Sequence, residues 1–139
     1  MLSTYAYVSR YVGSDLEADL KSIQASSQRS NASAGITGAL LYDAGRFVQV
    51  LEGTDSAIDA LLVRLRGDTR HRDFVELLRF RCDSRTFGDW TLHMRRLDRV
   101  EPSLDPEGLL RFRDAYLGCF RPDAREFVRL VASFFVVAR

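Results

Sequence analysis

Cysteine is scarce in this chain of 139 residues, which contains two cysteines and two histidines. Two cysteines cannot build the several crosslinks of a disulfide framework. With only His71 and His93 to help them, Cys82 and Cys119 do not make a zinc site either. We therefore expect no bound metal, and a fold held together by an ordinary core, for which an apolar content of 46% is typical.

Long hydrophobic runs are also missing. The longest is far short of the ~20 apolar residues that a membrane span needs, and no basic segment followed by an apolar one opens the chain, as in a signal peptide. An excess of one charge is absent too, because 20 basic residues face 19 acidic ones. Nucleic-acid binders usually carry a basic excess or patch. These absences predict a cytoplasmic protein that binds neither a membrane nor nucleic acid.

The length is that of about one domain. Residues 2–10 alternate and are rich in Tyr and Val, which is typical of a strand. The run Ser14-Asp15-Leu16-Glu17 is a capping box that starts a helix, and apolar residues at helical spacing carry this helix to about residues 30–31. Further strands are expected at residues 35–42, 46–52, 74–82 and 90–96, a turn at 43–45, a charged loop at 68–73, and a second helix after Thr54 or Asp55.

The resulting order, β-α-β-β-α-β with a fifth strand, is the ferredoxin-like pattern of an α+β fold with a mixed sheet. Its two helices cover one face of the sheet. The third strand is apolar on both sides, with Phe47 on one and Val48 on the other, so a second layer must cover the opposite face. Residues 99–139 contain two amphipathic helices. We expect them to pack there as part of the same domain as the core, residues 1–98.

One polar side chain interrupts an apolar row of the third strand. Gln49 points the same way as Phe47, and a buried amide costs free energy unless it is hydrogen-bonded. Either Gln49 faces solvent on an edge strand, or it belongs to a buried polar cluster. In the ferredoxin-like order the first and third strands are neighbours, so Tyr7 can face Gln49 beneath the first helix. The polar end of that helix, at Ser30-Asn31, would complete such a cluster.

Several motifs around Gln49 occur together and in order. They are Tyr7-Val8-Ser9, Asn31, the run from Gly35-Ile36-Thr37-Gly38 to Tyr42, Phe47-Val48-Gln49-Val50-Leu51-Glu52-Gly53, Asp68 with residues 70–73, and Phe87-Gly88-Asp89-Trp90. Together they resemble the BLUF family, the flavin-binding blue-light sensors. The resemblance spans residues 2 to 98.

The resemblance implies a flavin between the two N-terminal helices, with FAD as the usual form and FMN as the other possibility. Tyr7 and Gln49 would be the photoactive pair: Tyr7 would bond to Gln49, and Gln49 to the ring near N5 or C4=O. Asn31 would pair with the ring's N3–H and C4=O edge. The other cofactor contacts would be Ile23, Ser30, Phe47, Arg64, Leu65, Asp68, Arg70 and His71.

In proteins similar to this one, light drives an electron from the tyrosine to the flavin and a proton follows through the glutamine. The glutamine is left rotated or tautomerised, and the flavin spectrum shifts slightly to the red until the dark state returns. Such a local change biases a second element. The resemblance implies that this element is the fifth strand, with Trp90, Leu92 and Met94, and the C-terminal helices behind it.

Two residues depart from the family pattern. Ser30 stands where a second polar residue, often asparagine, precedes the flavin asparagine, and a hydroxyl there would reach the ring through water. Leu92 stands where methionine is common, and leucine cannot accept even the weak hydrogen bond of a thioether. Any relay through position 92 must therefore work differently in this chain.

The leading interpretation is a photoreceptor that is not an enzyme, because 139 residues leave no room for a cyclase or phosphodiesterase domain. Output would pass to an unknown downstream protein or through a homo-oligomer. Two alternatives stay open. A flavin-free protein-interaction module would fit Ser30 and Leu92, and an acylphosphatase-like enzyme would use Arg10 and Asn31. The lack of a glycine-rich phosphate loop after the first strand speaks against the enzyme.

Overall fold

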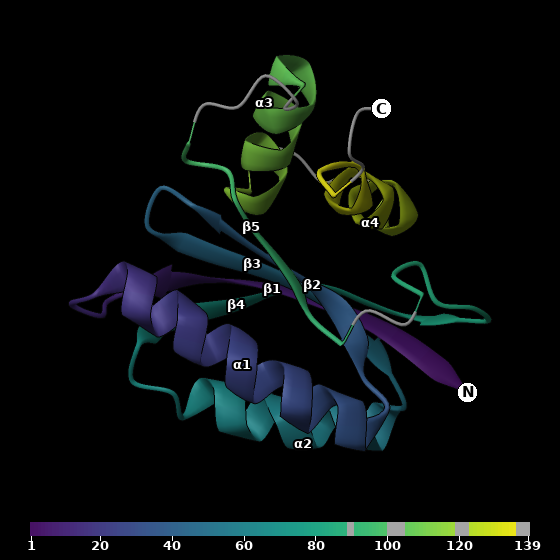
Figure 1. The fold of residues 1–139 in the computed structure, drawn as a ribbon. Coiled ribbons are helices and arrows are strands. Elements are labelled where there is room, and N and C mark those ends of the chain that lie inside the picture. The colour runs from purple at the N-terminus through teal and green to yellow at the C-terminus, as the bar shows by residue number, and fades with distance from the viewer. Residues whose placement is uncertain (89–90, 100–104, 119–122, 136–139) are drawn as a thin grey trace.

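A five-stranded mixed sheet forms the centre of the molecule (Figure 1). The computed structural model describes residues 1–88, 91–99, 105–118 and 123–135. The strand order is β4-β1-β3-β2-β5, antiparallel except for the parallel pair of β2 and β5. The elements are β1 (Leu2–Tyr11), α1 (Leu16–Ala34), β2 (Thr37–Asp43), β3 (Arg46–Gly53), α2 (Asp55–Arg66), β4 (His71–Cys82), β5 (His93–Arg96), α3 (Pro106–Tyr116) and α4 (Ala124–Ser133).

Two layers of helices cover the sheet, as the two-sided apolar pattern predicts. In Figure 1, α1 and α2 lie on one face of the sheet, and α3 and α4 stand on the other. Val48 and Val50 of β3 pack in a single buried cluster with Phe112 of α3 and Phe127 of α4. Two smaller clusters lie on the α1 and α2 side. The predicted ferredoxin-like α+β fold with C-terminal helices on the opposite face is confirmed.

Several predicted boundaries differ from the structure. The N-cap of α1 is Asp15 rather than Ser14, since its Oδ1 accepts the hydrogen bond from Ala18 N at 3.2 Å. The helix continues past residues 30–31 to Ala34, because the first residue suited to end it is Gly35, which adopts φ +68°. β4 already begins at His71, in the predicted charged loop, because pairing with β1 recruits these residues.

The last of the family motifs, Phe87-Gly88-Asp89-Trp90, lies partly outside the described residues. Trp90, the first residue of the predicted fifth strand, is outside them, and so is Cys119. Thr91 and Leu92 precede β5, which begins at His93. No helix in the described ranges is long and apolar enough to cross a membrane, and within the same ranges no cluster of His, Cys, Asp or Glu is arranged to hold a metal ion.

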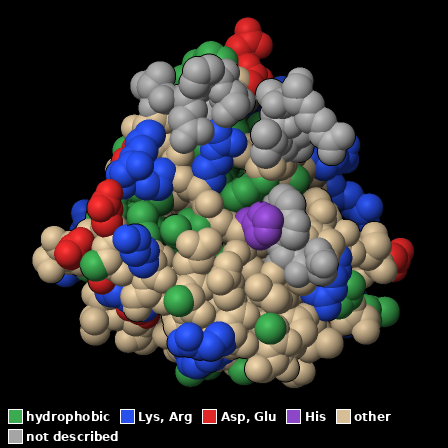
Figure 2. Space-filling view, in the orientation of Figure 1, with side chains coloured by type: hydrophobic (Ala, Val, Ile, Leu, Met, Phe, Trp, Pro, Cys, Tyr) green, Lys and Arg blue, Asp and Glu red, His purple; other side chains and the backbone are tan. Residues whose placement is uncertain are grey.

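One face of the surface is shown in Figure 2. The Lys and Arg side chains on this face are scattered rather than gathered into a patch. The part that lies over α1 carries few charged side chains, in keeping with the many Ser, Gln and Ala residues of that helix.

Candidate functional site

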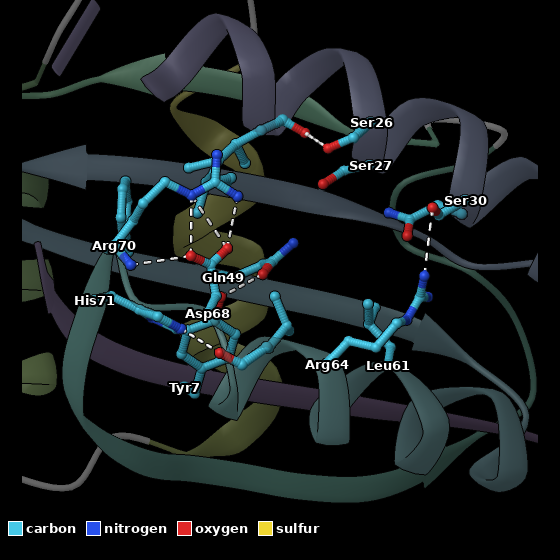
Figure 3. Close-up of a pocket in the computed structure, with 15 residues that line it drawn as sticks. Tyr7, Ser26, Ser27, Ser30, Gln49, Leu61, Arg64, Asp68, Arg70 and His71 are labelled. Carbon is cyan, nitrogen blue, oxygen red and sulfur yellow. Dashed lines mark hydrogen bonds and ion pairs between the residues drawn. The ribbon is translucent and has the colours of Figure 1, made fainter. Parts of the chain in front are cut away.

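A cavity of about 140 Å³ opens between α1, α2 and the sheet (Figure 3). Tyr7 and all ten residues that the resemblance marks as cofactor contacts line this one cavity. Their roles toward a cofactor stay a prediction, but their convergence from five elements and a loop is a property of the fold. Sequence reasoning missed four lining residues, Ser26, Ser27, Leu40 and Leu61. Helical spacing from Ser30 and Leu65, and the β2–β3 pairing of Leu40 with Gln49, would have found them.

Tyr7 and Gln49 meet at the sheet side of the cavity. They are direct partners in the pairing of β1 with β3, and Tyr7 Oη donates a hydrogen bond to Gln49 Oε1 at 2.5 Å. Both side chains are buried, and β3 is the central strand of the sheet. The interpretation of Gln49 as a solvent-facing edge residue is therefore wrong. Because Oε1 accepts the phenol, Nε2 is left to donate elsewhere, and no group among the described residues accepts from it.

Aromatic rings surround the Tyr7 phenol. Phe74 stacks on it with ring centroids 4.3 Å apart, and the His71 ring is 6.2 Å away. Burial raises the pKa of Tyr7 well above its usual value, and the nearby carboxylate of Asp68 adds to the effect. The phenol consequently stays protonated near neutral pH and acts as a donor to Gln49. An electron can leave this group easily only if its proton leaves with it.

Asn31 forms the opposite polar wall of the cavity. Its Nδ2 donates to the backbone oxygen of Thr91 at 2.7 Å, which ties α1 to the segment before β5. Its Oδ1 is buried and accepts no hydrogen bond within the described part of the chain. A buried polar atom without a partner costs about 1–3 kcal/mol. This oxygen therefore fits a ligand that presents an N–H to it, as the edge of a flavin ring does.

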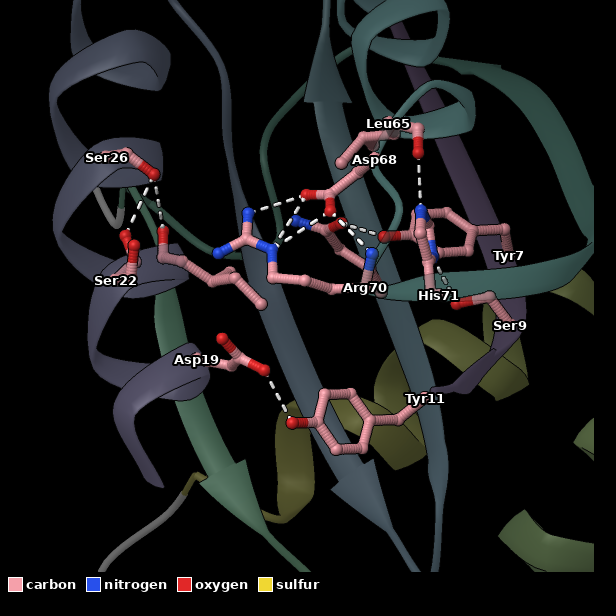
Figure 4. A network of polar contacts seen from close by, with 12 residues as sticks. Tyr7, Ser9, Tyr11, Asp19, Ser22, Ser26, Leu65, Asp68, Arg70 and His71 are labelled. Carbon is pink, nitrogen blue, oxygen red and sulfur yellow. Dashed lines mark hydrogen bonds and ion pairs between the residues drawn. The ribbon is translucent and has the colours of Figure 1, made fainter. Parts of the chain in front are cut away.

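His71 and Arg70 close one end of the cavity (Figure 4). The His71 ring joins three elements, because Nε2 donates to the backbone oxygen of Leu65 and Nδ1 accepts from Ser9 Oγ at 2.6 Å. Arg70 grips Asp68 with two parallel bonds, from Nε to Oδ1 at 2.9 Å and from Nη2 to Oδ2 at 2.6 Å. These bonds hold the pKa of Asp68 below its usual range. This end of the cavity is thus rigid and carries paired charges.

The walls between these polar groups are largely apolar. Ile23 of α1 and Leu61 and Leu65 of α2 line opposite sides, with Leu40 and Phe47 from the sheet. At the mouth, the Arg64 guanidinium of α2 reaches Ser30 Oγ of α1 at 3.4 Å (Figure 3). The shape is a slot with apolar sides and a polar rim, suited to a flat ring with a polar edge and a charged tail.

Two of the predicted relay residues, Leu92 and Met94, lie beside the cavity rather than in it. Leu92 is fully buried and packs with Leu40, Phe47 and Tyr42, and Met94 packs partly buried against the same cluster. Leu92 and Met94 therefore belong to the same hydrophobic cluster. The backbone oxygen of Leu92 also accepts a bond from Gln28 Nε2 of α1 at 3.3 Å. Trp90 is outside the described residues.

The Asp68–Arg70 pair yields a prediction about pH. Asp68→Asn should lower the free energy of unfolding at pH 7 by about 1 kcal/mol, a modest value because the two side chains are 24% and 30% exposed. The folded pKa of Asp68 lies below the reference value of 3.8, so this stabilisation is present above 3.8 and is lost as pH falls through the lower folded pKa. Urea unfolding of parent and variant should show the difference at pH 7 and a smaller one at pH 3.

Asp83→Asn is the matched control, because Asp83 is exposed and forms no ion pair with any other described residue. It should leave stability unchanged at both pH values. A difference for Asp68→Asn that stays constant from pH 7 to pH 3 would exclude the ion pair as its source.

Comparison with known proteins gives one consistent family. The family described as sensors of blue-light using FAD, abbreviated BLUF, matches residues 2–93. A photoactivated adenylate cyclase subunit alpha from Euglena gracilis is 40% identical over 87 residues, which is 63% of this chain but 8% of that protein. The chain thus spans less than a tenth of that relative's length.

Solved structures point to the same family. BlrB, described as a BLUF protein in its dark state, superposes with a TM-score of 0.79 at 30% identity, covering 96% of this chain and 97% of that one. Klebsiella pneumoniae BlrP1 with FMN and cyclic diGMP gives a TM-score of 0.72 at 33% identity, covering 96% of this chain and 34% of that one. The family match covers well over half of the chain, and it falls on the elements that build the cavity. The chain belongs to the BLUF family, whose members sense blue light with a bound flavin.

Proposed function

We propose that this chain binds the flavin in the cavity between α1 and α2 and reads its excitation through Tyr7 and Gln49. The observation that carries the proposal is the 2.5 Å hydrogen bond from Tyr7 Oη to Gln49 Oε1 beside that cavity. Among the described residues, no group accepts from Gln49 Nε2, and none donates to Asn31 Oδ1 across the cavity. A flavin ring offers both missing partners, a carbonyl and an N–H on the same edge.

Different residues of the cavity would bind different parts of the flavin. Asn31 Oδ1 would accept from the ring N3–H, and Gln49 Nε2 would donate toward C4=O or N5. Ile23 and Leu65 would contact the faces of the ring, and Arg64 and Arg70 would hold the polar tail. We propose FAD as the flavin, because the family description names it. FMN, which accompanies BlrP1, shares the same ring and would use the same contacts.

In the light reaction, the residues around the ring transfer one proton, from Tyr7, and rearrange one amide, that of Gln49. When bound, the flavin absorbs blue light and accepts one electron. Tyr7 is the donor, and its phenolic proton passes first to Gln49 Oε1, the atom to which it is already bonded. Rotation or tautomerisation of the Gln49 amide changes the donor that it presents to the cavity. The electron and the proton then return to Tyr7, which leaves only the Gln49 amide rearranged. No covalent bond holds this arrangement, so the amide reverts in the dark.

The test is an absorption spectrum of the purified full chain before and after blue light. We expect a yellow protein that releases free flavin into the supernatant after heat denaturation. Illumination should shift its visible bands to the red, and the shift should decay in darkness. A colourless protein would favour the flavin-free module, and flavin retained in the precipitate would indicate a covalent adduct. Either result would contradict the proposal.

We propose that the output passes to a separate downstream protein or a second copy of the chain, and that the chain is not itself an enzyme. The acylphosphatase-like alternative gains no support from its two residues. The exposed Arg10 guanidinium pairs with Asp73 at 3.2 Å, and Asn31 is engaged with Thr91. A carboxylate thus lies beside the Arg10 guanidinium, and the Asn31 amide nitrogen, which would donate to a phosphate, already donates to a backbone oxygen.

Position 92 tests how the signal leaves the cavity. Leu92→Met keeps nearly the same volume, so the free energy of unfolding should change by less than ~1.5 kcal/mol. The red shift should survive, because Tyr7 and Gln49 are intact. Dark recovery, or the light-minus-dark amide I infrared signal, should change, because a thioether accepts a weak hydrogen bond where leucine offers only packing. If both measurements match the parent, position 92 contributes packing alone.

A further inference from the structure

A half-buried ion pair lies outside the lining of the cavity, where the β2–β3 hairpin meets α3. Asp43, the last residue of β2, is 0% exposed. Arg113 of α3 holds it with two bonds of 2.8 Å, from Nε to Oδ2 and from Nη2 to Oδ1. Tyr116, one turn further along α3, donates its hydroxyl to Asp43 Oδ2 at 2.5 Å. Nothing in the proposed light reaction uses these three residues, which we call the Asp43 clasp.

The Asp43 clasp fixes the position of α3 on the hairpin more than it adds to the free energy of unfolding. Removing the Asp43 carboxylate and part of the Arg113 guanidinium from water offsets much of their attraction, so the pair adds little net stability. A forked guanidinium–carboxylate pair, however, requires the two planes to be aligned. Burial and the neighbouring carboxylate raise the pKa of Tyr116, which keeps its hydroxyl as a donor. The clasp therefore holds α3 in one register on the hairpin.

The same guanidinium also touches the segment that follows β5. Arg113 Nη2 reaches the backbone oxygen of Leu97 at 3.4 Å, and Leu97 N donates to the backbone oxygen of Tyr42 at 2.7 Å. At the other end of this strand, the backbone oxygen of Thr91 accepts from Asn31 in the cavity wall. Residues 91–97 thus run from a cavity residue to the clasp, with a direct hydrogen bond at each end.

β5 is the strand of this sheet with the least backbone pairing. It has four residues, lies at the sheet edge and pairs only with β2 among the described residues. Elements with few backbone bonds open most easily. The bond from Arg113 to Leu97, the residue after β5, is longer, at 3.4 Å, than the 2.8 Å bonds from Arg113 to Asp43. A small shift of β5 would therefore change the contact between Leu97 and the Arg113 guanidinium before it changes the bonds from Arg113 to Asp43.

We propose that Asp43 and Arg113 are positioning residues for signal output, through which α3 responds to movement of β5. The inference rests on the proposed light function and adds the contact at which the C-terminal helices receive the signal. When residues 91–97 move at the Asn31 end, the Leu97 contact changes, the guanidinium reorients, and the hold of Asp43 on α3 weakens. α3 then becomes more dynamic while the hairpin stays in place.

Hydrogen exchange of the flavin-loaded full chain, measured by mass spectrometry in darkness and under blue light, tests this. In the parent, light should speed exchange of the α3 amides severalfold. In Arg113→Gln the dark rate should already be raised and light should change it less than twofold, with the red shift intact. Arg111→Gln, on the same helix but exposed and without an ion pair among the described residues, should behave as the parent.

Tyr116→Phe covers the case in which Arg113→Gln does not fold, because it removes one hydroxyl and keeps the ring. It should reduce the light-dependent change in α3 and leave the red shift unaltered. A red shift without any light-dependent exchange in α3 of the parent overturns the inference, and so does a parental light response in Arg113→Gln or Tyr116→Phe. A parent without any red shift overturns the proposed function itself, which is a different and recognisable result.

Discussion

Tyr7→Phe should retain its flavin and lose the light-induced red shift completely. The substitution removes the hydroxyl that donates to Gln49 at 2.5 Å but keeps the ring that stacks on Phe74. Without the phenolic hydroxyl, no proton passes to Gln49 Oε1, and the amide does not rearrange. Absorption spectra in darkness and under blue light measure the effect, with the flavin content of heat-treated samples as the check on binding.

Tyr11→Phe is the matched control for this experiment. Tyr11 lies on the same strand, and its hydroxyl donates to Asp19 at 2.5 Å, but it does not line the cavity (Figure 4). Its ring contacts Phe47 edge-on, so the substitution preserves that wall of the cavity. The control should keep the full red shift. An undiminished shift in Tyr7→Phe, or in Gln49→Leu, would show that the light reaction uses another donor.

Phe112→Ala should have the largest effect on stability, lowering the free energy of unfolding by about 3–5 kcal/mol. The Phe112 ring is 0% exposed and contacts Tyr116, Phe127 and Phe134, with ring centroids 5.1–5.7 Å apart. Such a loss is a large part of the stability of a typical domain. Chemical denaturation followed by circular dichroism measures it. Leu110→Ala, on the same helix but 61% exposed, should stay within ~0.5 kcal/mol of the parent.

The same experiment tests the expected single domain. If residues 99–139 belong to one folding unit with residues 1–98, Phe112→Ala should shift one cooperative transition, and flavin should be released in that transition. Two separate transitions, with flavin release unaffected by the substitution, would show that the C-terminal helices fold on their own.

Local patterns were enough to predict most of the architecture. Alternation places Gln49 and Phe47 on one side of β3 and Val48 on the other, since successive side chains of a strand point to opposite faces. The side-chain oxygen of Thr54 and the helical apolar spacing after it locate α2. The errors fall at element ends. There, the end of α1 depended on which residue accepts a left-handed backbone, and the start of β4 on its pairing with β1.

The sequence by itself determined the order of the elements and the two-sided sheet, because these follow from periodicity. The ordered motifs, through the family that they resemble, pointed to most of the residues that line the cavity. The tertiary structure decided which polar atoms are satisfied. Only the folded chain leaves Asn31 Oδ1 without a partner among the described residues, and only there do Asp43 and Arg113, 70 positions apart, form an ion pair. Pairings of this kind depend on side chains brought together by packing, and no periodic pattern along the chain encodes them.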